Sequence, residues 1–321
     1  MKQNNTPSQN AYHVASLYQG QRIDRVIQSL TGTSRKKVKA FLDHGQVWLN
    51  QKKVVIASWE VKKGDKIEIR TLEQLRENPI SADAYYLKVI HHDKDILVVE
   101  KDAGVPCEQS PISTRPTLVA IINAYLKRRH THLPYHYIGL VHRLDQDTSG
   151  LMVYSLSKEA NKIISQFKKH TIQRKYLAIV HGSLKSEEGT IKSYLKKSDL
   201  LKGGQKVTES TEAAGQLAIT KYRVIERYPK ASLVELTLNT GRTHQIRVHM
   251  ASLGHPVVGD KVYGNPKGAK GTDNVPIRFE RQALHASYLA FFHPVTNEPM
   301  EFVSELPKDV KKLLLKLRKA V

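Results

Sequence analysis

Residues 139–157 read GLVHRLDQDTSGLMVYSLS, and this stretch carries more information about fold and chemistry than any other part of the chain. The segment LMVYS is a strand candidate that follows a glycine turn at Gly150. The segment HRLDQDTSG is a polar loop between apolar segments. Such a loop is either an ordinary turn or a site that a rigid scaffold displays. Three kinds of chemistry compete for it.

The first candidate is a calcium-binding loop. The first half of that pattern is matched by Asp145, Asp147, Ser149 and Gly150. A calcium loop of this type has glutamate at its twelfth position, where both carboxylate oxygens bind the ion. Here that position is Leu156, which has no ligand atom, so the pattern argues against calcium.

The other two candidates both use Asp145. Residues 145–148 fit the phosphate-transfer signature of an aspartyl phosphatase, but that chemistry needs a magnesium site built from further acidic residues. The later segment GDKVYG offers only Asp260 for such a site. In the third candidate, Asp145 is a lone nucleophile with Arg143 beside it. Because Arg143 precedes Asp145 by two residues, an extended backbone places both on the same side.

The segments around this loop predict an α+β domain with a mixed, mostly antiparallel sheet. Residues 87–106 resemble two strands around a turn, and the alternation in RKYLAIVHG (174–182) places Tyr176, Ala178 and Val180 on one face of a strand. Residues 237–254 read as strand, turn and helix, with a core stripe that comprises Ile246, Met250 and Leu253. The strands and helices after residue 86 show no βαβ rhythm, which argues against a parallel sheet.

A smaller block precedes this domain, from Gln21 to Arg70. Its segment RIDRVIQSL has helical spacing, and Ser34 is placed to cap a second helix, RKKVKAFLDHG. Short strand candidates follow. The block has 12 basic against 5 acidic residues, and four of the basic residues crowd the start of the second helix: Arg35, Lys36, Lys37 and Lys39. A bound phosphate at the helix N-terminus would offset this crowding, so the cluster favours RNA contact over a solvated helix face.

The bulk composition agrees with a nucleic-acid partner. The chain has 321 residues, with 51 Lys and Arg against 30 Asp and Glu, which gives a net charge of +21. Basic groups gain affinity for a polyanion by displacing its counterions. The single cysteine, Cys107, cannot form an internal disulfide, and we see no signal peptide or membrane-spanning run. We therefore expect a cytoplasmic protein without a membrane partner.

The loop resembles the signature of the RluA family of RNA pseudouridine synthases almost letter for letter, in His142, Arg143, Leu144, Asp145 and Thr148-Ser149-Gly150. Residues 174–182 resemble the family's second motif, residues 236–264 its third, and residues 284–294 its closing strand. One departure is Asp102, which stands where the family usually has proline. The resemblance implies a catalytic domain with a central RNA-binding cleft.

The resemblance also implies roles for individual residues. Asp145 is the catalytic carboxylate, Arg247 holds it charged, and Tyr176 lies against the target base. Arg143 enters the space that the flipped uridine leaves, and His142 shapes the loop. We assign Arg242, a cation at the start of the predicted helix, to RNA binding. We assign no role to His244.

The smaller block resembles the αL-type RNA-binding domain of small-subunit ribosomal protein four, through RIDRVI, SRKKVKAFLDHGQVWLN and GDKIEI. By this resemblance, the RNA contacts are Arg35, Lys36 and Lys39. We therefore expect a flexible extension (1–20), the αL-type domain (21–70), a linker (71–85) and the catalytic domain (86–321).

The expected function is isomerisation of uridine to pseudouridine in structured RNA. The reaction moves one bond within the substrate, so we expect no cofactor and no metal, and we interpret the histidines at 130, 132 and 136 as part of a basic loop. By family habit the substrate is large-subunit ribosomal RNA, with transfer RNA as an alternative, and the protein is a monomer. The alternative function is a non-catalytic RNA-binding or ribosome-assembly protein that retains the fold.

Overall fold

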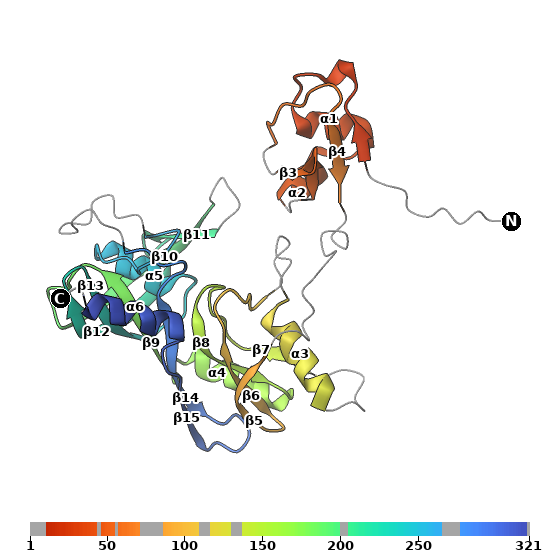
Figure 1. Cartoon of the computed structure of the whole chain (residues 1–321). Helices are drawn as coiled ribbons and strands as arrows, with labels where there is room; N and C mark the ends of the chain where they lie inside the picture. The colour runs from red at the N-terminus through yellow and green to blue at the C-terminus, as the bar shows by residue number, and fades with distance from the viewer. Residues whose placement is uncertain are drawn as a thin grey trace. The chain divides into compact units, whose positions relative to one another are not determined.

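The computed structural model describes residues 11–43, 46–54, 57–70, 86–108, 116–129, 137–199, 205–264 and 277–319. These residues form two compact units, the first built mainly from residues 11–70 and the second from residues 86–319 (Figure 1). The predicted linker, 71–85, lies outside the described residues. No helix in the described ranges is long and apolar enough to span a membrane.

The first unit packs two helices against a small antiparallel sheet of order β1-β4-β2-β3. Its elements are β1 (Ala11–His13), η1 (Ser16–Tyr18), α1 (Ile23–Thr31), α2 (Arg35–Asp43), β2 (Val47–Leu49), β3 (Lys52–Lys53) and β4 (Lys66–Ile69). The helical spacing seen in the sequence places Ile23, Val26 and Ile27 in the core, together with Val38 and Leu42 of α2. The amphipathic helices therefore form as their spacing predicts.

Two local features of the first unit refine the sequence analysis. Ser34 caps α2 as predicted, because its Oγ accepts a hydrogen bond from the backbone N–H of Lys37 at 3.4 Å. The expected flexible extension, 1–20, includes β1, which pairs with β4. Residues 11–20 are therefore part of the first unit, because strand pairing satisfies backbone groups that a free extension would leave to water.

The second unit is built on an eleven-stranded sheet. Nine of its strands follow the order β11-β10-β12-β13-β9-β14-β8-β6-β5, and the other two, β7 and β15, pair with β8 and β14. Its strands are β5 (Lys88–His92), β6 (Ile96–Lys101), β7 (Gly139–Leu140), β8 (Ser149–Ser155), β9 (Gln173–His181), β10 (Glu188–Asp199), β11 (Gln205–Ser210), β12 (Gln216–Tyr228), β13 (Ala231–Leu238), β14 (Leu284–Phe292) and β15 (Pro299–Val303). All pairings are antiparallel except that of β14 with β8. This confirms the predicted α+β class with a mixed, mostly antiparallel sheet.

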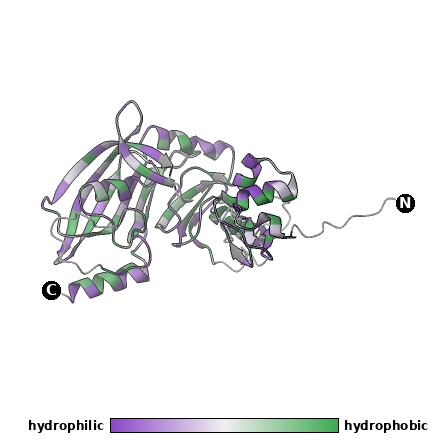
Figure 2. Cartoon of the chain, turned by 90° about the horizontal axis from the view of Figure 1, so that it is seen from above, coloured by the Kyte–Doolittle hydropathy of each residue, from purple (hydrophilic) through white to green (hydrophobic). Residues whose placement is uncertain are grey.

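Helices cover both faces of this sheet. They are α3 (Leu118–Arg129), η4 (Glu159–Lys162), α4 (Ile163–Lys168), α5 (Gln245–Ser252) and α6 (Lys308–Arg318). Residues of α3, α5 and α6 share one core with Leu97 and Val99 of β6, whereas η4 and α4 share another with Ile96 and Val98. Alternate residues of β6 therefore pack into two separate cores on opposite faces of the sheet. The helix beside the C-terminus in Figure 2 alternates in hydropathy, as expected of α6 with one buried face.

The parallel pair β8–β14 fixes the position of the loop that precedes β8. Gly150 has a φ of 119°, and a Cβ atom there would lie 2.2 Å from the backbone oxygen of Ala286 on β14. Only glycine permits this close approach of the two strands. The approach matters for function because the loop that contains Asp145 ends at this point.

One sequence prediction about α5 is wrong. Ile246 and Met250 are buried as expected, but Leu253 is 41% exposed. The helix ends at Ser252, and Gly254, with a φ of 81°, turns the chain away. The predicted stripe runs one residue past the end of the helix, because the glycine terminates it first.

Candidate active site

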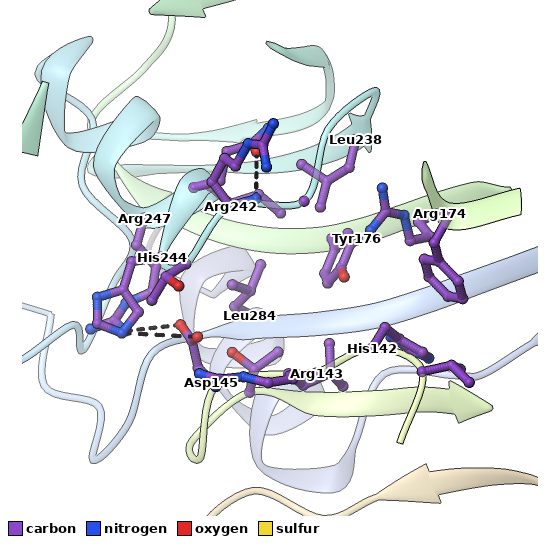
Figure 3. A pocket seen from close by; sticks show the side chains of 18 of the residues that line it. His142, Arg143, Asp145, Arg174, Tyr176, Leu238, Arg242, His244, Arg247 and Leu284 are labelled. Carbon is purple, nitrogen blue, oxygen red and sulfur yellow. Dashed lines mark hydrogen bonds and ion pairs between the residues drawn. The ribbon is translucent and has the colours of Figure 1, made fainter. Parts of the chain in front are cut away.

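A cavity of about 660 Å³ lies in the second unit. Five parts of the chain line it: the loop before β8, the end of α4, the start of β9, the stretch from Leu238 to Arg247, and Leu284 of β14 (Figure 3). The sequence-predicted residues at this cavity are His142, Arg143, Asp145, Tyr176, Arg242 and Arg247. The three motifs, which are far apart in the sequence, therefore meet at one place.

Asp145 and Arg247 are in direct contact in this cavity. Arg247 Nη1 lies 2.9 Å from Asp145 Oδ2, and the carboxylate keeps 22% of its side-chain surface open to the cavity. The guanidinium is almost fully buried, with 6% of its side-chain surface exposed. A buried cation hydrogen-bonded to a carboxylate fixes the orientation of that carboxylate.

A second carboxylate holds Arg247 from behind. Asp260 accepts hydrogen bonds from Nε at 2.6 Å and from Nη2 at 2.9 Å, and its side chain is fully buried. Burial acts to raise the pKa of Asp260, but the hydrogen bonds and charge of Arg247 outweigh it and hold that pKa below its ordinary value. Burial acts to lower the pKa of Arg247, but the hydrogen bonds and charges of Asp260 and Asp145 outweigh it and raise that pKa. Asp260 and Arg247 are therefore both charged at neutral pH.

Tyr176 lies on β9 with 7% of its surface exposed, and it lines the same cavity. Burial raises the pKa of its phenol, while the charge of Arg174 acts in the opposite direction and Asp145 adds to the rise. The phenol is therefore protonated at neutral pH. Its ring supplies a flat apolar surface in the cavity that Asp145 also lines, which suits stacking against a base.

His142 holds the loop to the sheet. Its Nε2 accepts a hydrogen bond from the backbone N–H of Val153 on β8 at 3.0 Å, and its ring stacks on Phe167 with centroids 4.7 Å apart. Burial, followed by the charge of Arg174, lowers the pKa of His142 to about 3. The ring is therefore neutral and serves as an acceptor, which agrees with a role in shaping the loop.

Arg143 and Arg242 occupy different surroundings at the cavity. Arg143 is exposed, and its Nη1 lies 2.6 Å from Glu108 Oε2. Arg242 lies three residues before α5 begins, not at the helix start as expected, and its Nε donates to the backbone oxygen of Leu217. The carboxamide of Gln245 fixes this turn, because Oε1 accepts from Arg242 N at 3.0 Å. The turn is therefore held by the first residue of the helix that follows it.

Comparison with known proteins places the chain in a family. Residues 95–252 match the RNA pseudouridylate synthase family, and residues 21–67 match the S4 domain. A relative from Bacillus subtilis, an uncharacterized RNA pseudouridine synthase, is 35% identical over 93% of this chain and 95% of its own length. The ribosomal large subunit pseudouridine synthase D of Zymomonas mobilis is also 35% identical, over 93% and 94%. The chain belongs to the RNA pseudouridine synthase family.

Solved structures agree with this assignment. The human RNA pseudouridylate synthase domain containing 1 is 26% identical to the chain, with a TM-score of 0.55, and the match covers 75% of this chain and 97% of that protein. The human RNA pseudouridylate synthase domain containing 4 has a TM-score of 0.59 at 23% identity, over 72% of this chain and 93% of the other. The second of these shows a shared fold. Together with the S4 match, the assignment makes RNA the partner of the synthase.

The predicted RNA contacts outside the cavity lie on α2 of the first unit. Arg35 and Lys39 are exposed there, and Lys36 belongs to the same helix, although its side chain lies outside the described residues. Their exposure leaves the two described cations available to phosphate. The histidines at 130, 132 and 136 also lie outside the described residues.

Three residues of the synthase site escaped the sequence analysis. Asp260 was considered only as a magnesium ligand, His244 received no role, and Arg174 was not considered. His244 is on the cavity wall, with Nε2 3.9 Å from Asp145 Oδ1 and Nδ1 2.9 Å from the hydroxyl of Tyr263. Burial lowers the pKa of His244, and Asp145 acts against this shift. Strand alternation places Arg174, two residues before Tyr176, on the same face of the strand, and this signal could have identified it.

The phosphatase alternative and one further cluster of possible metal ligands lose support in the synthase. Both oxygens of Asp260 are hydrogen-bonded to Arg247, so Asp260 cannot serve a magnesium ion as the phosphatase interpretation requires. Elsewhere in the described residues, Asp93, Asp95 and His293 lie close enough to hold a metal ion. However, Nδ1 of His293 accepts from the backbone N–H groups of residues 295 and 296. Its Nε2 therefore carries the proton and cannot bind a metal.

Proposed function

We propose that the protein isomerises uridines of large-subunit ribosomal RNA and that Asp145 is the catalytic carboxylate. The observation that supports this most directly is the chain of contacts from Asp145, at the cavity, through Arg247 to the buried Asp260. It provides one carboxylate, fixed in position, with a surface open to a ligand. The cavity also offers the Tyr176 ring as a platform for a flipped base.

The reaction requires little beyond this arrangement. The bond between ribose C1′ and uracil N1 breaks, the base rotates, and a bond forms between C1′ and C5. The proton lost from C5 balances the proton gained at N1, so no oxidant, reductant or further reactant is consumed. Asp145 acts at the ribose or the ring, and Arg247 holds it in position. Arg143, at the exposed edge of the cavity, would fill the stack that the uridine leaves.

The substrate class is inferred from relatives and from the first unit. The relatives in Zymomonas mobilis and Haemophilus influenzae are ribosomal large subunit pseudouridine synthases D. The exposed cations of α2 suit the backbone of a structured RNA. The proposal also takes the protein to be a monomer in the cytoplasm, where a reduced thiol is the expected state. Cys107 is buried and donates to the backbone oxygen of Leu144, so it is withheld from disulfide exchange.

The decisive experiment maps pseudouridine across all cellular RNA with and without the gene. We expect the deletion to remove specific pseudouridines from large-subunit ribosomal RNA, the wild-type gene to restore them, and Asp145→Asn to restore none. The matched control is Asp147→Asn, which neutralises a neighbouring aspartate of the same loop and should restore them. Restoration by Asp145→Asn would reject the carboxylate mechanism. If the deletion removes pseudouridines from transfer RNA alone, the substrate is transfer RNA and not ribosomal RNA.

The same variant tests the alternative of a non-catalytic RNA binder. Asp145→Asn removes one negative charge from a basic cavity, so purified variant and wild type should bind a large-subunit transcript with similar affinity. Isomerisation should fall by at least about a thousandfold, as expected on removal of a nucleophile. If the wild type binds RNA and forms no pseudouridine on any transcript, the binder interpretation holds.

A further inference from the structure

Arg174 is a buried cation that faces the cavity without an anionic partner. It lies two residues before Tyr176 on β9, on the same face, and 8% of its surface is exposed. Its Nε is buried and has no hydrogen-bond partner, and no ion pair to Arg174 is present among the residues that the structure describes. Its guanidinium carbon lies 5.4 Å from the centre of the Phe167 ring.

The other buried cations of the described chain are all matched by acceptors. Lys101 donates to three backbone oxygens, those of residues 102, 105 and 146. Arg247 binds two carboxylates, and Arg281 binds Asp309 through Nε and Nη2. Burial of an unpaired charge is strongly unfavourable, which is why such charges are almost always paired. Arg174 is the exception to this rule among the described residues, and it lies at the wall of the active-site cavity.

The surroundings of Arg174 suit an anion that enters from the cavity. Asp145 is the one carboxylate among the described lining residues, and Arg247 already binds it. Figure 3 shows Asp145 and Arg247 at one side of the cavity and Arg174 at the other, with Tyr176 between them. A Cβ atom on Gly241 would lie 2.7 Å from Arg174 Nη1. The lack of a side chain at 241 therefore keeps the guanidinium accessible along the backbone of that turn.

We propose that Arg174 binds a phosphate group of the RNA backbone next to the nucleotide that lies against Tyr176. The inference rests on the proposed function, because the nucleotide is the substrate. The flat guanidinium presents paired N–H donors that match two phosphate oxygens. This contact would offset the cost of the buried charge and would set the distance between the backbone and the Asp145 carboxylate.

The test compares small ligands that differ only in their phosphate. Binding of uridine, uridine 5′-monophosphate and uridine 3′-monophosphate is measured by ligand-observed NMR on the full chain. We expect one of the two monophosphates to bind the wild type about tenfold more tightly than uridine, as one charge-assisted contact implies. Inorganic phosphate should bind more weakly than that nucleotide. If inorganic phosphate binds as tightly as that nucleotide, the site is a general anion site and the inference is overturned.

Arg174→Met removes the charge and keeps an apolar stem against Phe167. We expect this variant to bind uridine and both monophosphates equally, and to melt at the same temperature as the wild type or higher, because an unmatched charge is gone. The matched control is Lys175→Gln, which removes one charge from the opposite face of the same strand. Lys175 pairs with Glu235 away from the cavity, so the control should keep the preference for phosphate.

Two results would overturn the proposal. One is a phosphate preference that survives in Arg174→Met. The other is a variant that melts well below the wild type or does not fold, because the charge would then be structural. Both measurements are independent of isomerisation, so an enzyme without activity on ribosomal RNA would reject the proposed function and leave the phosphate assignment to be judged by nucleotide binding.

Discussion

Asp260 holds Arg247 through two hydrogen bonds, 2.6 Å from Nε and 2.9 Å from Nη2, and leaves only Nη1 to reach Asp145. The backbone N–H groups of Val262 and Tyr263 donate to the same carboxylate. The guanidinium therefore cannot turn away from Asp145 without losing both bonds to Asp260. The orientation of the proposed catalytic carboxylate is set by a residue that has no surface in the cavity.

The first prediction concerns Asp260→Asn. The amide keeps the shape but loses the charge, so Arg247 retains a single anionic partner, Asp145. Breaking a buried ion pair on one side costs about 3–5 kcal/mol, and we expect unfolding free energy to fall by that order in denaturant titrations. We also expect kcat to fall more than KM rises, because the carboxylate is misplaced while the RNA contacts remain.

The control for Asp260→Asn is Asp309→Asn. Asp309 also binds a buried arginine, Arg281, at the start of α6. Neither residue belongs to the chain of contacts between Asp260, Arg247 and Asp145, although Arg281 donates to the backbone oxygen of Asp147. Asp309→Asn should lower stability and leave kcat near the wild-type value. An Asp260→Asn enzyme with wild-type kcat would show that the second carboxylate does not position the first.

The second prediction concerns Lys101, whose ammonium ties two loops together beneath the site. It donates to the backbone oxygens of Asp102 and Val105 in one turn and of Gln146 in the loop beside Asp145. Burial lowers the pKa of Lys101 to about 8, so the group is still charged at pH 7. The ammonium thereby fastens the turn in which Asp102 stands at the usual proline position.

Lys101→Met removes the donor to three backbone oxygens, of which that of Gln146 keeps a hydrogen bond from the Gly104 N–H. Each of the other two, those of Asp102 and Val105, loses a bond at a cost of about 1–3 kcal/mol, offset in part by removal of a buried charge, so the melting temperature should fall. Isomerisation should slow through kcat. Lys88→Met, on the neighbouring strand, removes an exposed lysine that pairs with Glu100 and should change neither quantity. Unchanged melting and unchanged kcat in Lys101→Met would refute the fastening role.

The sequence identified most of this site because its chemistry lies in local patterns. The loop around Asp145 was recognisable from its letters, and strand alternation placed Tyr176 on one face with Ala178 and Val180. The contact between Asp145 and Arg247 joins residues 102 positions apart. It depends on β8 and β9 both pairing with β14, and no local pattern states that order.

The residues that were missed act through tertiary placement. Asp260 follows an isolated bridge between Val257 and Val180, which carries its turn to the buried side of α5. Nothing in the letters GDKVYG distinguishes that placement from a surface turn. Leu253 shows the opposite error, because helical spacing alone cannot tell that Gly254 ends the helix one residue earlier. Spacing predicts which face is apolar, and terminating residues decide how far it extends.

The third prediction concerns the cations on α2. Arg35→Gln combined with Lys39→Gln should weaken binding to a large-subunit transcript and lower the slope of log affinity against log salt by about 2, one for each phosphate that the protein no longer neutralises. The kcat at saturating RNA should not change, because the cavity is intact. Lys62→Gln with Lys63→Gln removes the same charge from a turn of the same unit. If both pairs weaken binding equally, α2 makes no specific contact.

The fourth prediction is a pH dependence that comes from His249. This residue is fully buried, with Nδ1 2.8 Å from Thr220 Oγ1 and Nε2 3.1 Å from Ser193 Oγ. Burial lowers the pKa of His249 to about 4. Between pH 4 and about 6.5 the unfolded chain therefore binds a proton that the folded chain does not. Stability contributed by the neutral ring is present above about pH 6.5 and is lost as the pH falls towards 4.

His249→Gln isolates this contribution. The wild-type unfolding free energy should rise with pH across that window by up to about 1.4 kcal/mol per pH unit more than the variant's, the value for one proton. Other buried histidines titrate in both proteins and cancel in the comparison. Unfolding must be followed by circular dichroism, because the two tryptophans, Trp48 and Trp59, both lie in the first unit. Parallel pH profiles for wild type and variant would mean that His249 accepts a proton in the folded state.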